Sequence, residues 1–265
     1  MEIMWRRMIF NYKFFELLND KKEFENGAKS LLISLIIYIF QLKAFIICLS
    51  MMEFIITRLL VLPIPIYSDL VLMTVTNIPG LPRLSGCYIR GLYYKGLLKK
   101  MEHNVIIEQG VHIAHPECVE LSEFSFIDKN VILGADKCKV GRRVHIASNV
   151  MVTGGGEFEI EDYACIANGS TIITATETLK NGTRSSGPML PSAQRDVLRG
   201  FVKISKDAFI STQAIIFTNV TIAEGTVVGS NTVITKDTKP WKFYIQKGGK
   251  TVILKNRKKL ILPDV

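Results

Sequence analysis

Histidine is the side chain best suited to moving a proton at neutral pH, because its ordinary pKa of about 6.5 lies close to that pH. The 265-residue chain holds four histidines, and the last of them is His145, in the stretch RRVHIASNVMVTGGG at residues 142–156. The others are His103, His112 and His115. The five cysteines are scattered without a CxxC spacing, which indicates a reducing compartment rather than a disulfide framework. Whether His145 is a general base depends on the scaffold that presents it.

A six-residue period runs through the second half of the chain. From residue 204 the sequence reads ISKDAF, ISTQAI, IFTNVT, IAEGTV, VGSNTV and ITKDTK, and each hexad begins with an aliphatic residue. A small or β-branched residue precedes each of these by two positions. A helix would repeat about every 3.6 residues and a simple strand about every 2. A period of six therefore indicates short strands joined by tight turns, which is typical of a parallel β-helix.

The period extends upstream in groups of three. The aliphatic positions are Leu121, Ile127 and Leu133, then Val140, Ile146 and Val152, then Ile160, Ile166 and Ile172. Extra residues occur only after every third hexad, so three hexads make one coil with a triangular cross-section. The repeat stops over residues 173–203, which are predicted to form an excursion loop, because long loops are usually functional or disordered. The predicted organisation is a helical region at 1–100, a β-helix at 101–238 and a basic tail at 239–265 that caps it.

These hexads, with the run GTVVGSNTVITKDTKPW, resemble the hexapeptide-repeat acyltransferases, which fold as left-handed parallel β-helices. The likeness covers residues 101–255 and is greatest to sugar O-acetyltransferases of the maltose/galactoside and polysaccharide-modifying kind. It implies a mainly β protein, a homotrimer with active sites between neighbouring coils, and acetyl transfer from acetyl-CoA to a sugar hydroxyl without a metal. The left hand of the coil comes from this resemblance alone, since parallel crossovers are normally right-handed.

The resemblance also indicates an acceptor site. Family members use an excursion loop to cover the acceptor of an adjacent subunit, and many carry the catalytic histidine on it, after the residues TAT. Glu177 stands at that place in this chain. A subset of relatives has a stretch similar to VHIA…GGG followed by a loop without histidine, which makes His145 the implied general base for a sugar hydroxyl. Glu177 is expected to orient the imidazole or bind a sugar hydroxyl, and Asn181 and Arg184 are further acceptor-site candidates.

The donor is expected along the last coils. Matching repeat to repeat, the CoA-contacting positions fall on Thr212, Gly229, Ser230, Thr235 and Lys236. Gly229 and Ser230 are small, so a ligand could approach the backbone there. Lys236, Lys247 and Lys250 are expected to meet the phosphates of CoA, and residues 239–265 hold eight basic side chains against one acidic.

The N-terminal region carries an apolar stretch. Residues 30–68 hold only three charged side chains, Lys43, Glu53 and Arg58, and basic residues flank both ends. The flanks predict that both ends lie in the cytoplasm. About 20 apolar residues suffice for a span, but Lys43 in the middle makes one costly, and prolines at 63 and 65 break a second helix. Residues 30–68 are therefore predicted to contact membrane lipid from the cytoplasmic face, with a soluble helical cap or an oligomer contact as the alternative.

Other functions remain open. An N-acetyltransferase of an amino-sugar nucleotide would use the same chemistry on a different acceptor, and a non-catalytic β-helix would serve as a scaffold. A γ-type carbonic anhydrase would need three converging histidines, and His145 lies more than a coil from His112 and His115. No nucleic-acid partner is predicted, and the acceptor is expected to be a sugar or a membrane-proximal glycan.

Overall fold

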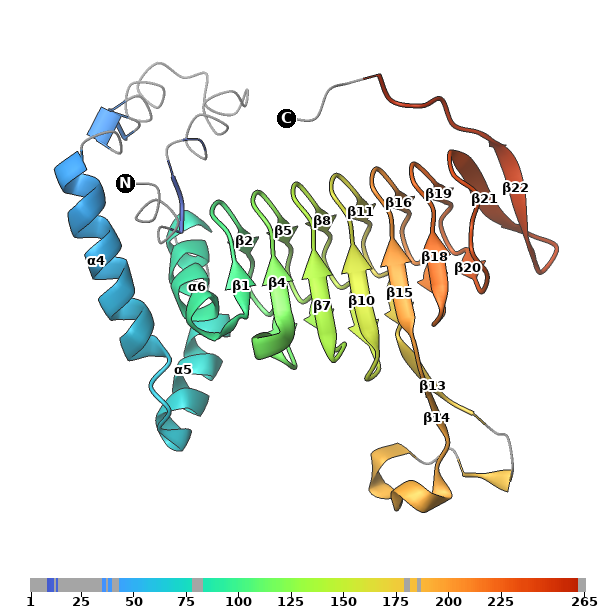
Figure 1. Cartoon of the computed structure of the whole chain (residues 1–265), viewed down its shortest axis with the longest axis horizontal. Helices are drawn as coiled ribbons and strands as arrows, with labels where there is room; N and C mark the ends of the chain where they lie inside the picture. Colours follow the sequence, from blue (N-terminus) through green and yellow to red (C-terminus); the bar gives the residue numbers. More distant parts are fainter. Residues whose placement is uncertain are drawn as a thin grey trace.

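Figure 1 shows the computed structural model of the chain, which describes residues 9–11, 13, 35, 36, 38, 39, 43–77, 83–178, 182–184 and 187–261. The described residues form a three-sided parallel β-solenoid with helices at one end and a β-hairpin at the other. The mainly β repeat fold predicted from the six-residue period is thus confirmed. The hand of the coil stays a prediction.

Three parallel sheets make the three faces of the solenoid. Face A consists of β1 (Lys100–Met101), β4 (Val119–Leu121), β7 (Lys137–Val140), β10 (Glu157–Ile160), β15 (Phe201–Ile204) and β18 (Val220–Ile222). Face B consists of β2 (Ile106–Ile107), β5 (Phe126–Ile127), β8 (His145–Ile146), β11 (Cys165–Ile166), β16 (Phe209–Ile210) and β19 (Val227–Val228). Face C consists of β3 (His112–Ile113), β6 (Ile132–Leu133), β9 (Met151–Thr153), β12 (Thr171–Ile173), β17 (Ile215–Ile216) and β20 (Val233–Ile234).

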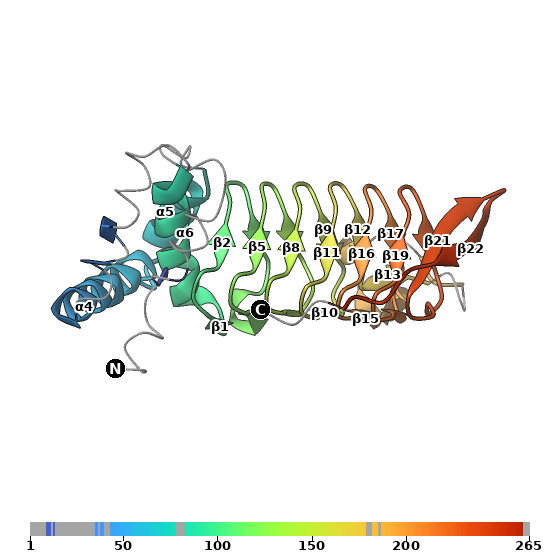
Figure 2. The same ribbon diagram turned by 90° about the horizontal axis from the view of Figure 1, so that it is seen from above.

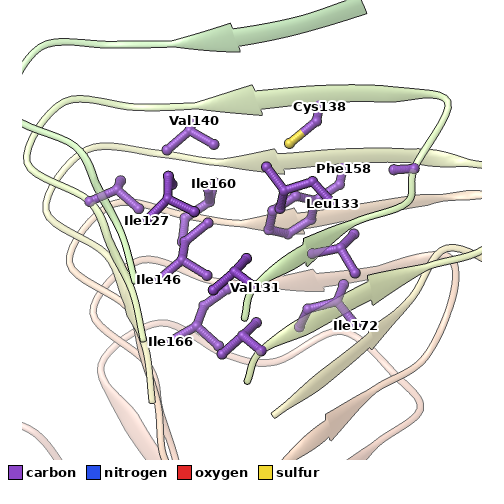
Figure 3. Packing of buried hydrophobic residues seen from close by; sticks show 14 of the residues in the cluster. Ile127, Val131, Leu133, Cys138, Val140, Ile146, Phe158, Ile160, Ile166 and Ile172 are labelled. Atoms are coloured by element: carbon purple, nitrogen blue, oxygen red, sulfur yellow. The ribbon is translucent and has the colours of Figure 1, made fainter. Parts of the chain in front are cut away.

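The core is a stack of the predicted aliphatic side chains (Figure 3). Ile146, Ile166 and Ile210 are each 0% exposed, and they lie in line because their strands pair in register, one coil after the next. Burying a side chain of this size stabilises the fold by roughly 1.5–3 kcal/mol. The residues two positions earlier, such as Ala208 and Ala214, are buried as well. Each strand therefore keeps its outward side chains in a fixed column on its face.

The corners of the triangle use left-handed backbone at regular positions. At the A–B corner these residues are Asn104, Phe124, Arg143, Tyr163, Asp207 and Gly225, and at the B–C corner they are Gly110, Asn130, Asn149, Gly169, Gln213 and Asn231. Glycine and asparagine adopt this conformation with little strain. Bulky residues at three A–B corners show that the coil imposes the conformation on whichever residue occupies the position.

The excursion leaves at the C–A corner between β12 and β15. It begins with an antiparallel ladder of β13 (Ala175–Glu177) and β14 (Val197–Arg199), and it carries the short 3-10 turns η4 (Gly187–Met189) and η5 (Ser192–Gln194). Another 3-10 turn, η2 (Pro116–Cys118), lies at this corner in the first coil. The hairpin of β13 and β14, called the excursion hairpin below, projects away from the solenoid (Figure 1).

The two ends of the solenoid are covered differently. Helices α4 (Lys43–Leu60), α5 (Pro65–Asn77) and α6 (Arg83–Leu97) lie at the N-terminal end, with α6 between α4 and the first coil (Figures 1 and 2). At the other end, β21 (Lys242–Lys247) joins face B in parallel with β19, and β22 (Lys250–Asn256) pairs with β21 as a hairpin. Across the described ranges, none of the helices combines the length and the apolar character that crossing a bilayer requires.

Candidate functional site

His145 lies on the outward side of face B, in the third coil. Its strand pairs with Phe126 on one side and Cys165 on the other, so these are its neighbours along the column, as the triplet alignment predicts. The imidazole stacks on the Phe126 ring, with centroids 5.0 Å apart and planes inclined by 18°. Its Nδ1 lies 4.0 Å from the Cys165 sulfur. The ring therefore has a fixed orientation although the side chain is 42% exposed.

A carboxylate, that of Asp128, also lies beside the His145 imidazole. Its Oδ2 lies 3.8 Å from Nε2 of His145, and its Oδ1 accepts a 2.7 Å hydrogen bond from the Lys129 backbone N–H. Nε2 is shielded from solvent and makes no hydrogen bond within ordinary distance. A small approach of the carboxylate would place the proton on Nε2 and leave Nδ1 as the basic nitrogen. Sequence reasoning missed Asp128, although the alignment that pairs Phe126 with His145 also places it one coil away.

The neighbouring thiol is not a nucleophile in this state. Burial raises the pKa of Cys165, and it raises the pKa of the fully enclosed Cys138 to about 12. A protonated, buried cysteine behaves as a small apolar side chain. Both cysteines are therefore explained by packing, as predicted.

The other described histidines lie elsewhere on the coil. His112 points outward from face C. His115 lies at the C–A corner of the first coil, where its two ring nitrogens lie 3.7 Å from Glu117 and 3.7 Å from Asp136. No group of three histidine, cysteine, aspartate or glutamate side chains within the described ranges is placed to hold a metal ion.

The acceptor residues predicted on the excursion do not meet His145 within one chain. The excursion hairpin leaves from the corner opposite face B, and Glu177 lies on its stem. Glu177 accepts two hydrogen bonds from the Arg195 guanidinium, at 3.0 and 2.5 Å, so its carboxylate is already paired. Within one chain Glu177 and His145 thus lie on different parts of the coil, and the role of Glu177 in orienting the imidazole or binding a sugar hydroxyl stays a prediction. Arg184 is exposed and its backbone N–H donates to Gln194, while Asn181 lies outside the described residues.

The glycines that follow His145 serve the hairpin rather than the histidine. A Cβ at Gly156 would lie 2.3 Å from the carbonyl oxygens of Gly200 and Thr174, and one at Gly154 would lie 2.4 Å from the Ala175 nitrogen. The chain that leaves and re-enters the coil passes directly over these residues. The GGG sequence thus makes room for the base of the excursion hairpin.

The predicted donor residues divide into two groups. Thr212 and Ser230 are exposed at neighbouring B–C corners, where the Asn231 N–H donates to the Thr212 carbonyl. Thr235, Lys236 and Lys250 line one cavity at the last coil, together with Tyr244 and Gln246. Lys247 is exposed beside it, near the tip of the β21–β22 hairpin.

Gly229, predicted to contact CoA, packs against a strand of its own chain. Its N–H donates to the Tyr244 carbonyl at 2.8 Å, and a Cβ there would lie 3.0 Å from Ile245. The close backbone approach predicted for a ligand at Gly229 is therefore taken by β21 of the same chain.

Comparison with known proteins finds acyltransferases that are similar to this chain. The dTDP-4-amino-4,6-dideoxy-D-glucose acyltransferase of Escherichia coli is 28% identical over 122 residues, which make up 46% of this chain and 63% of that protein. The matched segment thus spans less than two thirds of the curated relative. No family model matches the sequence.

Two structures of AntD, an N-acyltransferase from Bacillus cereus, superpose on the chain. A variant bound to dTDP-4-amino-4,6-dideoxyglucose and coenzyme A gives a TM-score of 0.57 at 27% identity, covering 62% of this chain and 86% of AntD. AntD with dTDP and 3-hydroxybutyryl-CoA gives 0.57 at 28% identity over the same shares. In sequence and in fold the chain is thus similar to acyltransferases that use CoA, as the hexapeptide resemblance implies.

These similarities confirm the resemblance to acyltransferases that the hexads carry. They also change the emphasis within it, because one relative is named as an acyltransferase of an amino-sugar nucleotide and the other as an N-acyltransferase. Neither name refers to acetyl transfer to a hydroxyl of a sugar or membrane-proximal glycan, which is the main prediction from the sequence.

Proposed function

We propose that this chain transfers an acyl group from acyl-CoA to the amino group of a nucleotide-linked amino sugar. The observation that carries the proposal is the outward group of His145, Asp128 and Phe126 on a coil that matches AntD over 86% of AntD's length. The AntD structures contain CoA or acyl-CoA together with dTDP or its amino sugar. The sequence-based prediction of acetyl transfer to a sugar hydroxyl becomes the second candidate.

The chemistry asks little of the protein beyond orientation and one proton transfer. A sugar ammonium must lose a proton before its nitrogen attacks the thioester carbonyl, and Nδ1 of His145, which lies 4.0 Å from the Cys165 sulfur, is the group that takes it. The C–N bond forms, the C–S bond breaks, and the CoA thiolate receives a proton as it leaves. Asp128 holds the imidazole in the tautomer that keeps Nδ1 free.

The donor would run along the coil axis. The cavity lined by Lys236 and Lys250 lies at the sixth coil, and His145 lies on the third. Neighbouring strands are about 4.8 Å apart, so the two positions are separated by about 15 Å along the axis. A CoA molecule with its phosphates at the lysines would direct its extended arm toward His145.

A second copy of the chain is needed to enclose this site. His145 lies on an open face, and the excursion hairpin lies at the opposite corner. Faces B and C carry exposed apolar side chains at Phe209, Ile132 and Met151. Face A also exposes Phe201, but beside it lie the charged pairs Lys137–Glu157 and Lys139–Glu159. The homotrimer predicted from the resemblance would cover faces B and C and bring a neighbour's hairpin over His145.

An acceptor comparison tests the proposal. Release of free CoA thiol is measured with dTDP-4-amino-4,6-dideoxyglucose and with the matched nucleotide sugar that has a hydroxyl at C4. Turnover with the amine alone supports N-acylation, and turnover with the hydroxyl alone establishes the second candidate. Saturable CoA binding without turnover on either sugar or on a panel of other amino sugars would overturn the assignment and leave a non-catalytic scaffold.

A further inference from the structure

Helix α4 buries polar side chains and exposes apolar ones, the reverse of the usual arrangement in a soluble protein. Its buried side carries Ser50 and Glu53, which are 4% and 2% exposed. Its outward side carries large apolar side chains that are 45–61% exposed: Ile47, Met51, Met52, Phe54, Ile55 and Leu59. Among the positions of α4 whose exposure the structure describes, residues 44–60, Arg58 is the only exposed charged residue. A surface of this kind marks a contact with another molecule or with a membrane.

The width of this outward face favours lipid over a protein groove. Successive residues of a helix are about 100° apart around its axis. The exposed apolar positions between residues 47 and 59 therefore cover about half of the helix circumference. A helix that docks on a protein needs an apolar stripe of roughly 100°. A helix lying in a membrane interface buries a wider apolar face and holds its cationic groups at the level of the lipid headgroups. Further exposed apolar side chains follow α4: Leu62 and Ile64 in the connecting turn are 37% and 54% exposed, and Ile66 at the start of α5 is 85% exposed.

A cavity with cationic walls opens beside this face. It lies between α4 and α6 and is lined by Glu53, Phe54, Thr57, Arg58, Val61, Lys95 and Gly96. Gly96 permits the close packing, because a Cβ there would lie 2.7 Å from Val61. Phe54 belongs both to the outward face and to the cavity wall, and the Arg58 guanidinium lies 5.3 Å from its ring centroid. The cavity is therefore continuous with the apolar face.

The charges in the cavity suit an anion. Glu53 is held in place by the Tyr88 hydroxyl at 2.8 Å and the Ile9 N–H at 3.1 Å. Lys95 lies against this carboxylate, and Arg58 adds a second cation at the mouth, so the walls carry two positive charges against one negative. Burial lowers the pKa of Lys95 to about 8, which leaves the amine mainly protonated at pH 7.

We propose that α4 lies on an anionic bilayer, with its outward face among the acyl chains and the phosphate of one phospholipid in the cavity between Arg58 and Lys95. An apolar face that suits acyl chains lies directly beside cations that suit a phosphate. This combination matches an anionic phospholipid. The inference goes beyond the proposed transfer reaction and does not depend on it. It would place the enzyme, and therefore its acceptor, beside a membrane, consistent with the predicted location at a cytoplasmic face.

Vesicle co-sedimentation of the full chain tests this, with phosphatidylcholine vesicles compared with vesicles that also contain phosphatidylglycerol. Met51→Glu and Ile55→Glu should each weaken partition roughly tenfold or more, because each moves a charge into the acyl region. Arg58→Gln should remove the preference for the anionic lipid while leaving apolar binding. Met189→Glu, at an apolar residue 91% exposed on the excursion, and Lys129→Gln are the matched controls and should change nothing.

Three results would overturn the proposal. One is failure of the wild-type chain to bind either vesicle. Another is binding that survives both α4 substitutions but disappears in Lys258→Gln/Lys259→Gln, which would assign it to the basic tail. The last is loss of self-association in Met51→Glu without vesicles, which would show that a second copy covers α4. Thiol release by the soluble fraction is recorded in parallel, so that failure here is distinguishable from failure of the transferase proposal.

Discussion

The imidazole of His145 lies flat on the ring of Phe126, 5.0 Å between centroids, because the two residues occupy the same outward position in successive coils. A parallel solenoid fixes such a pair without any dedicated contact, since the register of the core determines the register of the surface. Stacking covers a face of the imidazole, and its edge carries the two nitrogens, Nδ1 beside the Cys165 sulfur and Nε2 beside the Asp128 carboxylate.

Replacing His145 with alanine should reduce acyl transfer by about 10²–10⁴, the usual contribution of a general base. CoA affinity should stay unchanged, because the proposed phosphate contacts lie three coils away. Stability should change little, since the side chain is 42% exposed and leaves no cavity. Steady-state thiol release and CoA titration measure the two quantities separately. His112→Ala, which removes an exposed histidine from face C, is the control, and equal losses in both variants would remove His145 from the mechanism.

Asp128→Asn should produce a smaller loss than His145→Ala. The asparagine keeps the shape and can still accept the Lys129 N–H, but it no longer attracts the proton to Nε2 of His145. The rate constant for transfer should therefore fall while the KM for acyl-CoA stays constant. In the His145→Ala background, Asp128→Asn should have no further effect, because the two side chains act as one unit. An additive loss in the double variant would show that Asp128 acts on its own.

Much of the fold was predictable because the hexads impose a single register. Once Ile146 and Ile166 are assigned inward, the faces, the stacking of Phe126 on His145 and the break after residue 172 all follow. The hand of the coil does not follow from the period. Nor does the antiparallel stem of β13 and β14, since the excursion has no repeated pattern to fix its pairing.

The candidate site was predictable only in part. The outward position of His145 and its neighbours came from the alignment of hexads. The pairing of Glu177 with Arg195 could not be predicted, because it depends on how the excursion folds on itself. The packing of β21 against Gly229 could not be predicted either. The tail after the last hexad carries no period that would place β21 on face B. Sequence patterns thus located what the repeat determines and not what the insertions determine.

The base of the excursion hairpin offers a test with an internal control. Gly156→Ala places a methyl group 2.3 Å from two backbone oxygens that cannot move away as a side chain can, so we expect a loss of roughly 1–3 kcal/mol in the free energy of unfolding. At Gly155 the nearest atoms, 3.1–3.4 Å away, belong to the flexible side chains of Arg199 and Asp136. Gly155→Ala should therefore stay within about 0.5 kcal/mol of wild type. Urea denaturation followed by circular dichroism compares them, and similar losses would contradict the proposed crossing of the chain.

The last prediction concerns Lys95 and Glu53 between α4 and α6. Burial lowers the pKa of Lys95 to about 8, whereas an unfolded lysine has a pKa of about 10.4. Between these values the unfolded chain binds more protons at Lys95 than the folded chain, so the contribution of Lys95 to the free energy of unfolding should rise with pH through this window. The rise should reach about 3 kcal/mol at most by its upper end.

The measurement is a urea series between pH 7.5 and 9.5, since burial also raises the pKa of Tyr88 and Tyr94 and their ionisation would oppose the trend at higher pH. The reference is Glu53→Gln/Lys95→Met, which removes both charges and so avoids leaving one of them alone in the cavity. As the pH increases, the free energy of unfolding of the wild type should rise relative to that of the double variant. The reason is that only the wild type has a buried charge, on Lys95, that is lost over this range. Parallel curves for the two proteins would show that Lys95 keeps an ordinary pKa, and would weaken the case for a confined cation beside α4.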